Sequence, residues 1–344
     1  MKTAKKSNII LFFILLSTII LVISACSGKK STDEEKKDSL DESAENSVIQ
    51  ATPPGINDGN TIATENGQNN EEPIDNDEEV SDGYIGTMEY NGADCPLLIY
   101  NNLSYCVAGD HAVVSYSLFT DDTMEEYSVL ESIEYEGKSY PVTVIDVDAF
   151  FGFSSVVKIS LPASIKIIEE GAFDGCEALE EINIPEGVEM IGEAAFSGCS
   201  SLTSITFPES IKELGTGIFF DCSALETVIF PESITVIPDD TFTNCESLID
   251  LVIPSSVTTI GSEAFWTCTS LTAIDLPEGI TSIGDRCFYG CENLTEVTLP
   301  SSLTLAGNNT FDFCDNLTVL TVPSGKGSKF SEMFKDYDFE INER

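Results

Sequence analysis

Phenylalanine, proline and cysteine each recur at a fixed interval of 23 residues between positions 150 and 323 of the chain. The phenylalanines are Phe150, Phe173, Phe196, Phe219, Phe242, Phe265, Phe288 and Phe311, and the prolines are Pro162, Pro185, Pro208, Pro231, Pro254, Pro277, Pro300 and Pro323. The cysteines are Cys176, Cys199, Cys222, Cys245, Cys268, Cys291 and Cys314. A strict period over eight units without an insertion is typical of a solenoid, in which each coil packs only against its neighbours.

Within one unit, the apolar positions predict short strands. Ile182 and Ile184 flank a polar residue, as in a strand with one buried face. Pro185 is predicted to end the strand, because proline has no N–H to donate to a neighbouring strand. A second apolar pair gives a brief return strand or turn, and residues 172–176 suit a single helical or 3₁₀ turn. We therefore expect an α/β repeat solenoid that is mostly β, with short helical or 3₁₀ turns and a parallel sheet along one face.

The unit A-F-x-G-C-x-x-L-x-x-I-x-L-P-x-x-I-x-x-I-G resembles the BspA-type leucine-rich repeat, also called the Treponema-type repeat. This resemblance covers about half of the chain and implies a bacterial surface protein of the adhesin or binding class. Some members of that class attach to host matrix proteins or to neighbouring cells. An envelope scaffold that organises other surface proteins remains the alternative, and a hydrolase with an unrecognised site is a weaker one.

The repeats, residues 150–323, are flanked by two segments that leave the period. Residues 83–149 contain strand-like runs around a hairpin turn at 136–138, and we expect a small β-rich cap that covers the first coil. Residues 324–344 contain Phe330, Met333 and Phe334 at helical spacing. This segment is predicted to cap the last coil.

The first residues have the pattern of an export signal. Three lysines precede an apolar run that ends at Cys26, and residues 1–25 are predicted to be a lipoprotein signal peptide that is removed before a lipidated Cys26. An uncleaved transmembrane anchor is the alternative. Residues 26–82 are strongly acidic with almost no aromatic residues, which predicts a disordered linker. Either anchor places the remaining chain on the outer face of the bacterial membrane, and two acyl chains give stable attachment.

The net charge of the chain and its lack of catalytic motifs exclude several classes of function. The chain has 59 acidic and 16 basic residues, a formal charge of −43, so we expect no nucleic-acid partner, because that binding depends on Lys and Arg. His111 is the only histidine, and no catalytic or phosphate-binding motif is present. We therefore predict no enzymatic activity, no cofactor and no metal site, although the sequence leaves calcium binding between coils open.

The cysteines have two predicted roles. Those that follow the 23-residue period occupy the same slot in each coil and should be small buried thiols. Cys95 and Cys106 lie outside the period and are eleven residues apart. In an exported domain, such a pair is expected to form a disulfide.

Two surfaces are candidates for ligand binding because the repeat does not dictate their residues. Ile229, Ile249 and Val252 should point outward from the sheet and form an apolar patch, although strand propensity alone explains β-branched residues there. Phe220, Trp266 and Tyr289 follow the repeat phenylalanine and should lie on one lateral edge. Trp266 and Tyr289 should be neighbours there, where they either bind a protein or glycan ligand or simply cover the core.

Overall fold

The computed structural model describes residues 83–116 and 124–344. The predicted signal peptide 1–25, the lipidation site Cys26 and the linker 26–82 lie outside the described residues. Within the described ranges, no helix is both long and apolar enough to cross a membrane.

The described chain begins with the predicted β-rich cap. Its strands are β1 (Gly83–Tyr90), β2 (Ala93–Tyr100), β3 (Leu103–Ala108), β4 (His111–Ser115), β5 (Glu126–Ser128), β6 (Ser132–Tyr135) and β7 (Lys138–Ile145). The first four form an antiparallel meander, and β6 and β7 form a hairpin. The turn residues Glu136 and Gly137 both have positive φ, 49° and 74°, as a tight hairpin turn requires.

The cap continues directly into the repeats through backbone hydrogen bonds. Strand β4 pairs in parallel with β7, and β7 pairs in parallel with β9 (Ile167–Ile168) of the first coil. Strand β5 pairs in parallel with β8 (Lys158–Ser160). The cap therefore satisfies the strand edges of the first coil, while the boundary at residue 149 stays a prediction.

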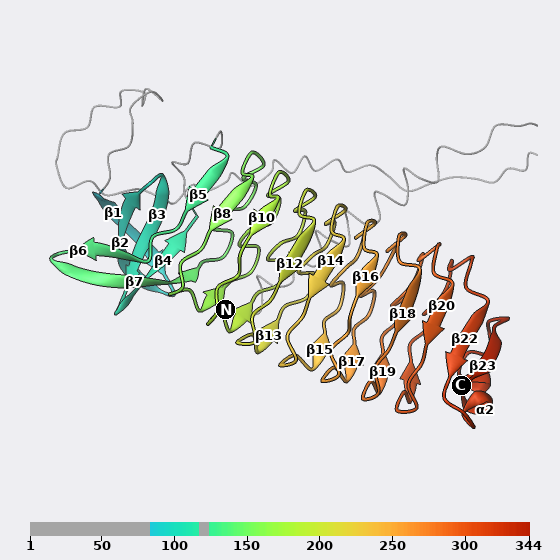
Figure 1. Ribbon diagram of the computed structural model, residues 1–344. Helices are drawn as coiled ribbons and strands as arrows, with labels where there is room; N and C mark the ends of the chain where they lie inside the picture. The colour runs from blue at the N-terminus through green and yellow to red at the C-terminus, as the bar shows by residue number, and fades with distance from the viewer. Residues whose placement is uncertain (1–82, 117–123) are drawn as a thin grey trace, which may run out of the picture. The chain divides into compact units, whose positions relative to one another are not determined.

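The repeats form two rows of short parallel strands (Figure 1). The first row continues from β8 through β10 (Glu181–Ile182), β12 (Ser204–Thr206), β14 (Thr227–Ile229), β16 (Asp250–Leu251), β18 (Ala273–Asp275), β20 (Glu296–Thr298) and β22 (Val319–Val322). The second row continues from β9 through β11 (Met190–Ile191), β13 (Glu213–Leu214), β15 (Val236–Ile237), β17 (Thr259–Ile260), β19 (Ser282–Ile283) and β21 (Leu305–Ala306). Paired residues are one period apart, as in Ser204 with Thr227. The predicted fold class is confirmed, and the second row adds a further parallel ladder to the predicted sheet.

The short turns of each coil bond to the next coil rather than within a helix. Cys176 N–H donates to Phe173 O within the turn, but Phe196 N–H and Gly198 N–H donate to the next coil, at Ile218 O and Phe220 O. Two positions per coil are left-handed, as at Ala194 and Gly198 with φ of 53° and 68°. Left-handed residues interrupt a right-handed helix, so these segments remain turns.

The core is a stack of the repeat phenylalanines. All eight are 0–2% exposed, and neighbouring rings are 5.1 to 5.9 Å apart between centroids. Helix α2 (Gly327–Met333) and β23 (Glu340–Glu343), which pairs with β22, follow the last coil. Phe330 and Phe334 are buried, and the Phe334 ring centroid lies 5.4 Å from that of Phe311, while the boundary of the C-terminal cap stays a prediction.

The structure also locates the cysteines. The seven periodic thiols are buried and free, and burial raises the pKa of thiols such as Cys176, to about 12. Cys95 and Cys106 are buried on the antiparallel neighbours β2 and β3. Both thiols are free in this structure, and the disulfide stays a prediction. Burial first, and the Cys95 thiol second, raise the pKa of Cys106.

Candidate functional site

The first candidate surface is the apolar patch formed by Ile229, Ile249 and Val252. Ile229 ends β14, where its buried neighbour Val228 points into the core, so Ile229 points outward. The three side chains are 55%, 53% and 78% exposed. Their predicted exposure is confirmed, and they lie on two adjacent coils, because β14 pairs with β16.

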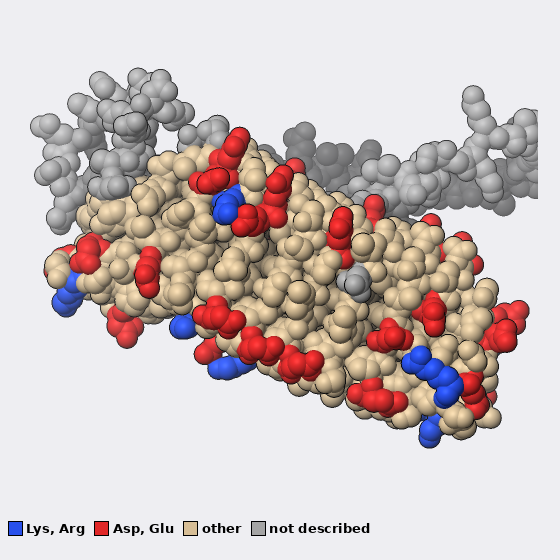
Figure 2. All heavy atoms as spheres, viewed as in Figure 1, with Lys and Arg blue, Asp and Glu red and all other residues tan. Residues whose placement is uncertain are grey.

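The apolar patch lies in the middle of a row of strands that carries charges elsewhere. In Figure 2, charged side chains lie along the edges of the visible face and near both ends of this row, and fewer lie over the central coils. The repeats carry 26 acidic and 4 basic residues between positions 150 and 323, and Glu181, Asp275 and Glu296 are exposed on strands of this row. An apolar centre with a polar rim is the usual composition of a protein interface.

The second candidate surface is an aromatic edge made of Trp266, Tyr289 and Phe313. The Trp266 and Tyr289 rings stack with centroids 4.5 Å apart and planes at 29°, which confirms their predicted contact. Phe313 extends the row, with its centroid 4.8 Å from that of Tyr289. Phe220 does not join the row, because the coil between carries the buried Thr243 at the same position.

Charged groups support the Trp266 end of the aromatic edge. The Arg286 guanidinium carbon lies 5.2 Å from the centroid of the Trp266 ring, a cation–π distance. Arg286 also pairs with Glu263, with Nη2 to Oε1 at 2.5 Å. Burial raises the pKa of Glu263 in spite of this cation. In the preceding coil, burial and then the Glu263 charge raise the pKa of Asp240 to about 6.

Phe313 was not identified from the sequence. It has φ of 61° and is 61% exposed, although glycine holds the equivalent position in four of the other coils, at Gly152, Gly175, Gly198 and Gly290. A bulky residue in the left-handed region is uncommon. The signal in the sequence is a large apolar residue in a column of small or polar ones.

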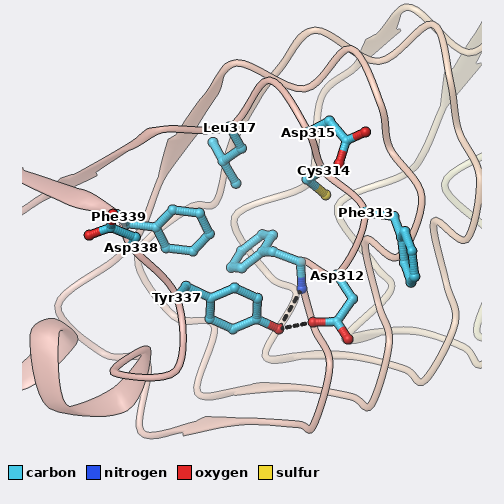
Figure 3. Close-up of a pocket in the computed structure, with 9 residues that line it drawn as sticks. Asp312, Phe313, Cys314, Asp315, Leu317, Tyr337, Asp338 and Phe339 are labelled. Atoms are coloured by element: carbon cyan, nitrogen blue, oxygen red, sulfur yellow. Dashed lines mark hydrogen bonds between the residues drawn. The ribbon is translucent and has the colours of Figure 1, made fainter.

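A pocket of about 340 Å³ lies beside Phe313, where the last coil meets the chain after α2. It is lined by Phe311, Asp312, Phe313, Cys314, Asp315, Leu317, Tyr337, Asp338 and Phe339. Figure 3 shows the Phe313 ring at one end and the Tyr337 and Phe339 rings at the other, with Asp312 between them and Asp315 above, on the other side of Cys314. The Tyr337 and Phe339 rings stack at 5.0 Å.

The pocket is held together by Tyr337. Its hydroxyl donates to Asp312 Oδ1 at 2.9 Å and accepts from the Phe311 N–H at 3.2 Å. Burial, together with the Asp312 carboxylate, raises the pKa of Tyr337 to about 12. These bonds fix the C-terminal segment against the last coil, so the pocket is preformed.

The groups considered for chemistry lie apart from both surfaces. His111 begins β4, and its Nδ1 is 3.3 Å from the exposed Asp110 carboxylate. In residues 83–116 and 124–344, no group of three or more His, Cys, Asp or Glu residues could hold a metal ion.

Comparison with known proteins gives one family and several related structures. The model of the BspA type leucine-rich repeat region matches six copies over residues 125–249 and 235–342. The Treponema pallidum leucine-rich repeat protein is 29% identical, with 71% of this chain and 97% of that chain covered and a TM-score of 0.47. A leucine-rich cell surface protein of Faecalibacterium prausnitzii is 19% identical, with 70% and 98% covered and a TM-score of 0.28. The pneumococcal vaccine antigen PcpA is 17% identical, with 72% and 98% covered and a TM-score of 0.27. No curated protein matches the chain in sequence.

Proposed function

This chain belongs to the BspA-type leucine-rich repeat family, and we propose that it is a non-catalytic binding protein of the bacterial cell surface. Its leader and Cys26 support export and lipid anchoring, with the acidic linker holding the folded repeats away from the membrane. The ligand is a protein or a glycan on host matrix or on a neighbouring cell.

The observation that carries this proposal is the exposed apolar patch of Ile229, Ile249 and Val252. Val252 is 78% exposed, and a valine with this exposure, beside Ile229 and Ile249, contributes nothing to the core. Groups of exposed apolar side chains mark interaction sites on soluble proteins. Because the surrounding repeats are acidic, an anionic ligand would be repelled, so the contact energy must come from apolar and uncharged polar groups.

The aromatic edge is a second contact surface. Trp266 and Tyr289 are partly exposed, and aromatic residues are the commonest anchors of binding interfaces. Each ring is already stacked on another, so their exposed rims rather than their full faces are offered to a ligand.

A binding screen tests this function. Full-length protein is applied to an array of neutral glycans, matrix proteins and envelope proteins of the same bacterium. We expect saturable binding to a glycan or a matrix protein. Binding confined to the bacterium's own envelope proteins would indicate an envelope scaffold and not an adhesin. Turnover of an arrayed glycan would contradict a non-catalytic role.

A further inference from the structure

The pocket beside Phe313 combines features that the repeat itself does not require. Phe313 occupies a left-handed position where a side chain is strained, and it exposes an aromatic ring to water. Both features disfavour phenylalanine relative to glycine in the free protein. A contact with a bound group would compensate for them.

Phe313 is the most accessible ring of the aromatic edge. Trp266 contacts Tyr289 and the Arg286 guanidinium, whereas Tyr289 lies between Trp266 and Phe313. Phe313 has one ring neighbour in the row, is tilted by 55° to it and stays 61% exposed. The ring therefore offers a surface to a ligand in the pocket (Figure 3).

The pocket is acidic as well as aromatic. Asp312, Asp315 and Asp338 line it, and none of its lining residues is basic. Asp315 and Asp338 are exposed, and neither forms an ion pair within the described ranges. Asp312 is held by Tyr337 and by Asn309, whose side-chain amide donates to Oδ2 at 2.5 Å, so its carboxylate is fixed in place.

We propose that this pocket, here named the arginine pocket, binds an arginine side chain of a protein partner. A guanidinium is planar, stacks on an aromatic ring and donates to carboxylates in a fork, which matches Phe313 together with Asp312 and Asp315. An ammonium group is more strongly hydrated and does not stack in the same way. A neutral sugar has no charge and would not be attracted electrostatically by the three carboxylates.

This inference rests on the proposed binding function and specifies part of its partner. The apolar patch lies on other coils, so a partner reaching both surfaces would present an arginine at one end of its contact area. The two surfaces can be tested independently for the same reason.

The test uses a blocked tripeptide, acetyl-Gly-Arg-Gly-amide, and its citrulline counterpart, which has the same shape without the charge. Full-length protein in detergent micelles is labelled with ¹⁵N at phenylalanine, and the amide signals of Phe311 and Phe339 are followed during titration. We expect saturable shifts of these signals with the arginine peptide, weaker binding of the lysine peptide, and no saturable shift with the citrulline peptide. Equal binding of the citrulline peptide, or displacement of the arginine peptide by a neutral oligosaccharide, would overturn the proposal.

Substitutions separate binding from folding. Phe313→Gly introduces the residue that other coils have at this position, and it should keep or raise the thermal midpoint. It should weaken binding of the arginine peptide by about fivefold or more, because the cation–π contact is lost. Phe151→Ala removes another exposed phenylalanine, 50% exposed, and should leave binding unchanged. Unchanged affinity in folded Phe313→Gly would contradict the assignment.

A second set of variants tests the carboxylates of the pocket and controls for the net charge of the protein. Asp315→Asn with Asp338→Asn should weaken binding of the arginine peptide. Glu186→Gln with Glu209→Gln changes the net charge equally at exposed sites in other coils and should leave that binding unchanged. Equal loss in both pairs would mean that the peptide responds only to net charge, and the proposal would fail. Loss of arginine-peptide binding with retained array binding would remove the arginine pocket and leave the proposed function standing. Binding of the arginine peptide without any ligand on the array would keep the arginine pocket and contradict the proposed function.

Discussion

The thiol of Cys245 donates a hydrogen bond of 3.2 Å to the carbonyl oxygen of Phe219 in the preceding coil. The same bond recurs along the solenoid, from Cys176 to Phe150 through to Cys314 and Phe288, at 3.0 to 3.3 Å. The periodic cysteines therefore link adjacent coils as donors as well as filling the core. A serine would donate too, but its shorter, more polar side chain would fill less of the site.

These bonds predict that the periodic thiols are inert in the folded protein. Burial raises the pKa of thiols such as Cys176 and Cys199, and the reactive form of cysteine is the thiolate. Mass spectrometry of protein isolated from the cell envelope should find the periodic thiols alkylated only after denaturation. Non-reduced peptides should show Cys95 joined to Cys106, which are buried neighbours. Disulfides between periodic cysteines would contradict this arrangement.

The phenylalanine stack should carry much of the stability. Phe242 is fully buried in a central coil between Phe219 and Phe265. Phe242→Ala should lower the free energy of unfolding by about 3–5 kcal/mol through lost burial and a cavity. Chemical denaturation measures this, with the exposed Phe151→Ala as control. A loss below about 1 kcal/mol would be incompatible with a core position.

Stability should rise as the pH falls below neutrality. Burial raises the pKa of Asp240 to about 6, and that of an unfolded aspartate is about 3.9. Between these values the folded protein binds more protons than the unfolded chain, so the free energy of unfolding decreases as pH rises through this window. The thermal midpoint should be higher at about pH 5 than at about pH 7.5.

The substitution Asp240→Asn tests the origin of this dependence. It should raise stability at neutral pH and flatten the profile, whereas Asp275→Asn, at an exposed strand position, should change the profile little. An unaltered profile in Asp240→Asn would assign the effect to the general negative charge of the chain.

Membrane attachment is tested at the predicted lipidation site. Cys26→Ala should release the protein into the medium or leave an unprocessed precursor, because the thiol that carries the lipid is absent. Partitioning of wild type and variant into detergent is the measurement. Identical partitioning would favour an uncleaved transmembrane anchor instead.

The sequence was sufficient to predict the core because the period holds every core residue at one position in each coil. Phe150 to Phe311 are buried at one position in each coil, and Trp266 contacts Tyr289 because both occupy one column. The second ladder was less evident, since strands of two residues leave little alternation to detect.

The arginine pocket was beyond the reach of the periodic pattern. It joins the last coil to Tyr337 and Phe339, which lie outside the repeat, so no register relates its two walls. Phe313 could have been singled out as an aromatic residue in a glycine column, but its exposure depends on a left-handed backbone that only the structure shows.

Three paired substitutions test the binding surfaces. The sheet-face variant is Ile229→Glu with Val252→Glu, and the edge variant is Trp266→Ala with Tyr289→Ala. A sheet control, Ser160→Glu with Asn183→Glu, adds the same charge at exposed positions of the same strand column. None of these side chains belongs to the phenylalanine stack, so all three proteins should fold.

The most direct measurement is the dissociation constant of each protein for the ligand found on the array. The sheet-face variant should bind more weakly by about 2 kcal/mol or more, roughly thirtyfold, while the sheet control stays close to wild type. A comparable loss in the edge variant would extend the contact to Trp266 and Tyr289. Wild-type affinity in both the folded sheet-face variant and the folded edge variant would contradict binding through the repeats.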